Sequence, residues 1–475
     1  MSNKISEEKF NYVNNSKSGS ITTTIGEGRI SNKVSTKEKF SYAIGSGGGN
    51  IITTVIGMFL TSYYTDSVGL AAAAVGTMML LARLLDGVVD IFMGGIIDKT
   101  KTRWGKSRPW ILISAPIICV GLILTFSVPS SFSDSGKLIY AYLTYIFINC
   151  IGMTIFMLSH TSLMARMTYD SHERQVMSSM NQIVNNVMSL IVSSIAVPMV
   201  SILGWKITAV IYGIITAVMV MVAFWGTREH IDMNEGSEQV TVENVSLKEA
   251  IPALLKNRYF YLLAIIFMIL LIISTGPGSV MIYYCNVTLE NPNMMTPLSI
   301  ASTLPMIIVN IFVPTIIRKI GRYKCMIINT LLVLVGFVII AIGESNVYYA
   351  IAGNIIKAFG MGTLFGCAFA LSAEVVDYGD WKYKVRSEGI INSCISFGQK
   401  VGLGLGAAGA SWILAAGGYV GTVAVQTQSA KSAIIFAFGY FGVILAIVLL
   451  IACIFMNVDK YSEEMKKELE ERRAK

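Results

Sequence analysis

The sequence predicts an all-α membrane protein with twelve transmembrane helices in two pseudo-symmetric six-helix bundles. Three observations support this prediction: the composition, the length of the apolar segments, and the spacing of the basic loops. Hydrophobic residues make up 54% of the 475 residues and charged residues only 14%, whereas soluble domains carry about 25% charged residues. A transmembrane β-barrel would instead show short segments of alternating hydrophobicity, a pattern that this sequence lacks.

The apolar segments account for the expected helices in order. Each is near or above the ~20 residues that a helix needs to cross a bilayer. In the first half they are 45–61, 70–95, 109–129, 138–165, 178–202 and 207–226. In the second half they are 259–284, 297–317, 325–342, 347–373, 389–415 and 432–456.

A polar segment divides these helices six and six. We expect a disordered N-terminal extension without a signal peptide, an N-terminal bundle, a central loop, a C-terminal bundle and a charged tail, at 1–38, 39–226, 227–257, 258–456 and 457–475. A weak repeat, Arg103-Trp-Gly-Lys-Ser-Arg108 after the second helix and Arg318-Lys-Ile-Gly-Arg-Tyr-Lys324 after the eighth, indicates duplication. Duplicated halves place a substrate near the bilayer midplane, between them.

The loops that carry most of the Lys and Arg predict the orientation. Loops 98–108, 318–324 and 376–388 are rich in basic residues, whereas the opposite loops carry little beyond Lys137 and Lys206. By the positive-inside rule we expect a multi-pass protein of the cell membrane with both termini in the cytoplasm. The net charge of +8 then reflects topology, and the dispersed basic residues do not predict nucleic-acid binding.

The reactive residue types do not predict an enzyme. The seven cysteines lie scattered within apolar segments, and the three histidines form no metal-ligand spacing. No nucleophile triad or phosphate-binding loop is visible either. We therefore expect no cofactor and no resident metal.

Asp86 and Asp90 are the most informative residues. They lie one helical turn apart in an apolar segment, so both face one side of the helix. An ionised carboxylate in the bilayer costs about 2.5–3.5 kcal/mol even on insertion scales, and a pair of them suits a small cation that binds and leaves. The alternative is a buried ion pair with Arg83, which can neutralise only one of the two.

Glycines in two corresponding helices are a weaker signal. Gly45 and Gly47 to Gly49 lie in the first helix, and Gly276-Pro277-Gly278 is expected to interrupt the seventh. Interrupted helices in corresponding positions point to a binding site, although close helix packing through small residues explains them equally well.

Several motifs spread over both halves resemble one family. They are Ser41-Tyr-Ala-Ile-Gly-Ser-Gly-Gly-Gly-Asn50, Tyr63-Tyr-Thr-Asp66, the segment from Arg83 to Asp90, Arg103 to Trp110, and Glu374-Val-Val-Asp377-Tyr-Gly-Asp-Trp381 followed by Arg386 and Glu388. Over residues 40–456 the chain resembles the glycoside–pentoside–hexuronide:cation symporters. The resemblance implies the major facilitator fold and the symport of a sugar with a cation.

The same resemblance implies a cation site at Asp86, Asp90 and Thr154. The position before the second aspartate, an asparagine in the melibiose-transporting members, is Val89 here. Because hard cations prefer several oxygen ligands, this loss weakens the case for Na⁺. A proton needs only one carboxylate, so we expect H⁺ or Na⁺ coupling with a slight preference for H⁺.

The implied sugar site is more neutral than in the melibiose-transporting members. Positions charged there are Gly49, Asn50, Met157 and Gln182 here, and Thr161 replaces a tryptophan. We expect the sugar to be held by Asn50, Asn149, Thr161, Gln182, Phe365, Asn392 and Lys400. Such a lining argues against α-galactosides as the main substrate.

Three further sites have alternative interpretations. Lys400, in an apolar segment, either pairs with Asp86 or Asp90 across the halves, contacts substrate, or extends to the membrane surface. His160 either relays protons or packs between helices. A third group of loop residues either forms a cytoplasmic gate, by pairing across the halves, or reflects the positive-inside rule alone, which explains the basic members but not Asp377 or Glu388. These residues are Arg103, Lys106, Arg108, Asp377, Trp381, Arg386 and Glu388.

The expected function is therefore cation-coupled uptake of a glycoside, pentoside or hexuronide by alternating access. The partners are a small sugar and the lipid bilayer. The alternative is a transporter of the same fold for a non-sugar cargo such as a lipid or a hydrophobic solute, which Met157 would favour.

Overall fold

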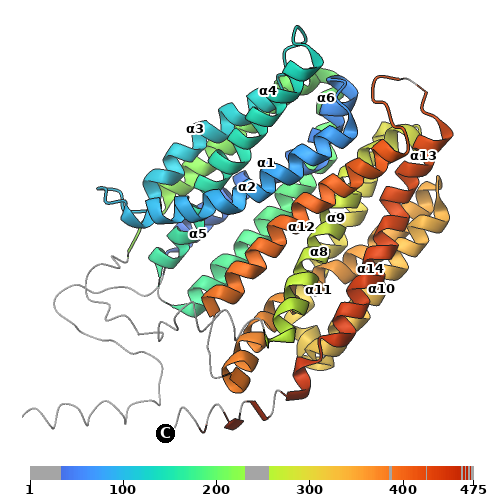
Figure 1. Cartoon of the computed structure of the whole chain (residues 1–475). Coiled ribbons are helices and arrows are strands. Elements are labelled where there is room, and N and C mark those ends of the chain that lie inside the picture. Colours follow the sequence, from blue (N-terminus) through green and yellow to red (C-terminus); the bar gives the residue numbers. More distant parts are fainter. Residues whose placement is uncertain are drawn as a thin grey trace, which may run out of the picture.

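The computed structural model describes residues 34–168, 170–230, 256–383, 388–423 and 425–461, together with 464, 465, 467, 468 and 471. Most of the expected N-terminal extension and of the central loop lies outside these residues. The described chain is helical apart from short connections, and it forms two groups of helices that lie side by side, blue to green and yellow to red in Figure 1.

The first half contains α1 (Thr36–Ser62), α2 (Ala72–Lys99), α3 (Arg108–Thr125), α4 (Asp134–Ile146), α5 (Thr154–Met167) and α6 (Ser171–Gly226). The π-helical segment η2 (Phe147–Met153) joins α4 to α5 without a break. Two helical segments meet in α6 at Gly204, whose φ of +76° is not helical. Such a φ strains residues with a Cβ, which explains the glycine at this position. The break at Gly204 marks the boundary between the expected fifth and sixth helices.

The second half contains α8 (Arg258–Tyr283), α9 (Met295–Ile320), α10 (Arg322–Gly343), α11 (Val347–Tyr383), α12 (Glu388–Ala416), α13 (Gln428–Ile435) and α14 (Phe441–Phe455). The short helices η3 (Tyr284–Thr288), η4 (Pro292–Met294), η5 (Phe436–Tyr440) and η6 (Val458–Tyr461) lie between or after them. Within the described residues, nine helices are long and apolar enough to cross a membrane. Helices α2 and α12 have 28 and 29 residues but carry charges.

Three expectations about local structure were wrong. Asp377 and Trp381 lie within α11, which continues to Tyr383. Arg108 and Glu388 are the first residues of α3 and α12, so none of these four is in a loop. Helix α8 runs through Gly276–Gly278 without interruption. A bundle tolerates Pro277 because its neighbours can satisfy the freed backbone group.

The glycines of α1 serve close packing. A Cβ built on Gly45 would lie 2.4 Å from Cβ of Ala223, and one on Gly49 would lie 2.4 Å from the Phe156 ring. Contacts this short exclude any side chain, so α1 packs closely against α6 and α5. Of the two interpretations of these glycines, close packing is the one that the structure supports.

The first helix of each half ends in the same way. The π-helical segment η1 (Tyr63–Ser67) follows α1, and η3 follows α8. Backbone N–H of Val68 donates to Tyr63 O, and that of Leu289 donates to Tyr284 O in the same pattern. Gly69 and Glu290 then adopt positive φ at the corresponding position, +84° and +51°.

The two tyrosines of this motif also make equivalent contacts. Tyr63 OH accepts a bond from Val128 N after α3, at 3.1 Å, and Tyr284 OH donates to Glu344 O after α10, at 2.6 Å. In each half, the first transmembrane helix is thereby fastened to the end of the third. This repeated arrangement supports the expected duplication of two six-helix bundles.

The halves meet along three helix pairs, α2 with α12, α1 with α8, and α6 with α9. The first of these pairs carries Asp86, Asp90 and Lys400. We call the end of the bundles opposite the basic loops 98–108 and 318–324 the outer end.

Candidate functional site

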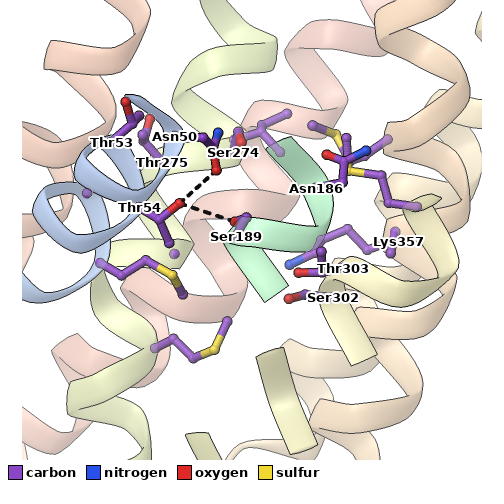
Figure 2. A pocket seen from close by; sticks show the side chains of 18 of the residues that line it. Asn50, Thr53, Thr54, Asn186, Ser189, Ser274, Thr275, Ser302, Thr303 and Lys357 are labelled. Atoms are coloured by element: carbon purple, nitrogen blue, oxygen red, sulfur yellow. Dashed lines mark hydrogen bonds between the residues drawn. The ribbon is translucent and has the colours of Figure 1, made fainter. Parts of the chain in front are cut away.

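A cavity of about 280 Å³ lies between the two halves. Helices α1 and α6 line it from one half and α8, α9 and α11 from the other. Figure 2 shows its polar side chains, which are Asn50, Thr53, Thr54, Asn186, Ser189, Ser274, Thr275, Ser302, Thr303 and Lys357. Hydroxyl and amide groups from facing helices can both donate and accept hydrogen bonds, as recognition of a polyhydroxylated ligand requires.

The α1 side of the cavity is held in a fixed arrangement. Thr54 Oγ1 lies 3.3 Å from Asn50 Oδ1 and 3.3 Å from Ser189 Oγ on α6. Figure 2 shows these three side chains together on one side of the cavity. Thr54 donates to Oδ1 of Asn50, and this bond leaves the NH₂ group of Asn50 available to donate to a ligand.

The expected sugar-binding residues divide between the cavity and other places. Asn50 and Phe365 line the cavity. Asn149 is buried and donates to Tyr145 O of its own helix. Thr161 and Gln182 are exposed and do not line the cavity, nor does Met157. The side chain of Asn392 lies outside the described residues.

Lys357 on α11 is a cavity residue that the sequence prediction missed. Its Nζ donates to Asn354 Oδ1 at 2.7 Å and lies 5.0 Å from the centre of the Phe337 ring. Its signal in the sequence was a single lysine inside the apolar segment 347–373, the same signal that drew attention to Lys400.

The expected cation residues lie together at the α2–α12 contact. Asp86 is buried, with 5% of its surface exposed, and its Oδ1 accepts a bond from Thr154 Oγ1 at 2.5 Å. Asp90 is more accessible, with 28% of its side chain exposed. Helix α5 therefore supplies a hydroxyl to the carboxylates of α2, as the resemblance implied.

Two basic residues balance these carboxylates. Lys400 Nζ lies 3.1 Å from Asp86 Oδ2 and also forms an ion pair with Asp90. Arg83 Nη1 lies 3.8 Å from Asp86 Oδ2. Of the alternatives for Lys400, the structure shows pairing with both aspartates. With Arg83 nearby, the two negative charges are matched by two positive ones.

His160 occupies a packing position. Its Nε2 lies 2.9 Å from Tyr42 O, and Tyr42 OH donates to His160 O at 3.0 Å. The two rings stack with their centres 3.9 Å apart. The imidazole of α5 is thus held against α1 by these contacts, which favours the packing interpretation.

Three of the expected gate residues make contacts within their own halves. Arg103 lies over Trp104, and Arg108 Nη2 donates to Phe224 O at 2.9 Å. Trp381 Nε1 donates to Glu468 Oε2 at 2.9 Å. Arg386 and the side chain of Glu388 lie outside the described residues.

Glu229 organises the loop before α3 and was not predicted. Its carboxylate accepts the backbone N–H groups of Lys106, Ser107 and Arg108 at 2.8–3.1 Å. An anion at a helix N-terminus is stabilised by the helix dipole. This acid therefore fixes the basic loop that carries Arg103 and Lys106, together with the first residue of α3, Arg108.

Contacts between the halves also occur at the outer end. Thr65 Oγ1 lies 2.7 Å from Tyr283 OH, and Tyr419 OH donates to Asp66 Oδ1 at 2.9 Å. Burial, and then the nearby Asp66 carboxylate, raise the pKa of Tyr419, so its hydroxyl stays protonated and keeps donating. These contacts hold the outer ends of α1, α8 and the segment after α12 together.

Known transport proteins are similar to this chain over most of its length. Residues 41–460 match the family described as MFS/sugar transport protein. The chain is 31% identical to the symporter YnaJ of Bacillus subtilis, over 88% of this chain and 91% of that one. It is 30% identical to the isoprimeverose transporter of Lactiplantibacillus pentosus, over 89% and 88%. The crystal structure of the nucleoside transporter NupG shares the fold, with a TM-score of 0.61 and 14% identity over 87% of this chain and 98% of that one.

Proposed function

Because the chain belongs to the MFS/sugar transport family and is a cation-coupled sugar symporter, we propose that it imports a glycoside, pentoside or hexuronide by alternating access. The sugar binds in the cavity between the halves, and H⁺ or Na⁺ binds at Asp86, Asp90 and Thr154. The observation that carries the proposal is the position of Lys400, which joins both carboxylates across the interface between the halves.

This position suggests how the cation is coupled to movement. Lys400 on α12 and a cation compete for the same carboxylates of α2. A proton or Na⁺ on Asp90, the more accessible of the two, weakens the attraction that holds the halves together. Linkage then requires that sugar and cation raise each other's affinity by the same factor.

A proton is the coupling ion that these contacts favour. With Lys400 and Arg83 already matching two carboxylates, a resident Na⁺ would add an uncompensated charge unless Lys400 moved away. A proton neutralises Asp90 without needing further oxygen ligands. Uptake measured separately in an H⁺ gradient and in a Na⁺ gradient distinguishes the two ions.

The contacts at the outer end suggest the state of the transporter. With both termini on the cytoplasmic side, as the basic loops predict, the bonds of Thr65 with Tyr283 and of Tyr419 with Asp66 close the extracellular entrance. Opening toward that side requires these bonds to break. The cell membrane is the location that this orientation implies.

Uptake of labelled sugars into proteoliposomes of the full chain tests the proposal. We expect one sugar of a panel of xylosides, glucosides, galactosides and glucuronides to accumulate in an H⁺ or Na⁺ gradient. Asp90→Asn should abolish accumulation but keep exchange of sugar across the membrane, because the sugar cavity is intact. Folded protein that moves no sugar of the panel would instead favour a non-sugar cargo.

A further inference from the structure

We propose that the cargo carries a single negative charge, and that Lys357 on α11 binds this group; the inference rests on the proposed function. The anionic group is a carboxylate or a sulfonate on a sugar. Figure 2 shows Lys357 directed into the cavity between the halves, on the side that α9 and α11 form.

The charges around the cavity are unbalanced. Among the described lining residues Lys357 is charged and none is acidic. The groups that its ammonium contacts, the Asn354 side-chain oxygen at 2.7 Å and the Phe337 ring with its centre at 5.0 Å, are both neutral. Lys400, by contrast, contacts two carboxylates. Two lysines in the same half of the protein are therefore in opposite electrostatic situations.

A lysine without an anion is costly at this depth. Placing an ammonium group near the centre of a bilayer costs about 2.5–3.5 kcal/mol on insertion scales, and polar neighbours recover part of that. A negatively charged ligand would recover more, because ion pairs strengthen where water is excluded. Among the described residues no carboxylate forms an ion pair with Lys357, which leaves the cargo as its counterion.

The rest of the cavity fits the remainder of such a ligand. Ser302 and Thr303 of α9, Ser274 and Thr275 of α8, and Asn50 of α1 present groups for sugar hydroxyls. Phe365 lies eight residues after Lys357 on α11, a rise of about 12 Å, so the charged end and the aromatic contact are well separated. This separation suits a glycoside whose acid and aglycone lie at opposite ends.

Charge matching selects among anions. One ammonium group balances a carboxylate or a sulfonate, each with one negative charge. A phosphate monoester carries about −1.5 to −2 at neutral pH, which would leave excess negative charge in the cavity. We therefore expect sugar acids, and not sugar phosphates, to be the cargo.

The test compares matched sugars in proteoliposomes of the full chain. Phenyl β-glucuronide, phenyl β-glucoside and the phenyl β-glucoside with a sulfonate in place of the C6 hydroxyl differ only at C6. Wild-type protein should take up one of the two anionic sugars at least tenfold more efficiently than the glucoside. Uptake of the glucoside in preference to both anions would overturn the inference while leaving the proposed function intact. Transport of none of the three, with uptake of another neutral sugar of the wider panel, would also overturn the inference alone, whereas silence across that whole panel would refute the proposed function itself.

Variants at Lys357 separate a binding role from a structural one. Lys357→Met should lower the efficiency for the anionic sugar at least tenfold, chiefly through KM, with little change for the glucoside. Lys357→Arg should retain the preference. Lys206→Met, the same change at an exposed lysine of α6, is the matched control. An equal loss for charged and neutral sugars in Lys357→Met would show that the lysine only supports the fold.

Discussion

Lys400 Nζ on α12 lies 3.1 Å from Asp86 Oδ2 on α2, so one side chain joins the two halves of the transporter beside its cation site. Truncating one member of a buried ion pair typically costs about 3–5 kcal/mol, because the partner charge is left unpaired. Here the partner charges are two carboxylates whose balance decides cation binding.

We accordingly expect Lys400→Met to reduce cation-driven accumulation of sugar more than tenfold. The measurement is uptake into proteoliposomes with an imposed H⁺ or Na⁺ gradient. Lys206→Met should accumulate sugar normally. Wild-type accumulation by Lys400→Met would contradict competition between this lysine and the cation.

Thr154→Val should weaken cation binding and spare the sugar. The hydroxyl of Thr154 donates to Asp86 at 2.5 Å, and a hydrogen bond to a charged group contributes about 1.5–3 kcal/mol. We expect the cation concentration for half-maximal uptake to change at least tenfold. Thr161→Val, on the same helix but exposed, is the control, and equal effects of the two substitutions would remove Thr154 from the cation site.

We expect the Tyr419→Phe variant to populate the state that is open at the outer end more than the wild-type protein does. It removes the hydroxyl that donates to Asp66 at 2.9 Å and leaves the ring in place. Labelling of a cysteine introduced at Asn286, which lies with Asp66 and Tyr419 in an outer hollow, should become at least threefold faster. Tyr440→Phe, at a half-exposed ring in η5, should label at the original rate; unchanged labelling in Tyr419→Phe would show that this bond does not limit opening.

The repeated positive φ after η1 and η3 predicts opposite effects of two substitutions. Gly69→Ala should destabilise the protein by about 1–2 kcal/mol, because residues with a Cβ are strained in the left-handed region. Glu290→Gly relieves the same strain at φ +51° and loses only an exposed ion pair with Lys431. Thermal unfolding in detergent should show a lower midpoint for the first and an equal or higher midpoint for the second. A lower midpoint for both would mean that the two turns are not equivalent.

The spacing of residues along a single helix was sufficient to predict part of the candidate site. Asp86 and Asp90 could be placed on one face because both lie on one helix, one turn apart. The partner of Lys400 could only be narrowed to alternatives, since contact across the halves depends on how they dock. Lys357 was overlooked because the sequence does not show which side of an apolar helix faces a cavity.

Asn149 was expected in the sugar site but does not line the cavity, and local helix geometry offers a physical reason. It lies in η2, where seven residues adopt π-helical geometry. A π-helical turn holds more residues than an α-helical turn, so side chains in and after it are rotated relative to a regular helix. The residue types of this segment do not reveal the π-helical turn, so the direction of the Asn149 side chain could not be predicted from the sequence.

The uncompensated ammonium group of Lys357 has a consequence for the energy source of transport. A cargo with one negative charge that travels with one monovalent cation moves no net charge across the membrane. A potential of 100 mV, equivalent to about 2.3 kcal/mol per elementary charge, then neither drives nor opposes uptake. The ion gradient alone sets the limit, about tenfold accumulation for a tenfold gradient. A depolarised cell would continue to import such a sugar acid, whereas its import of a neutral glycoside with the same cation would decline.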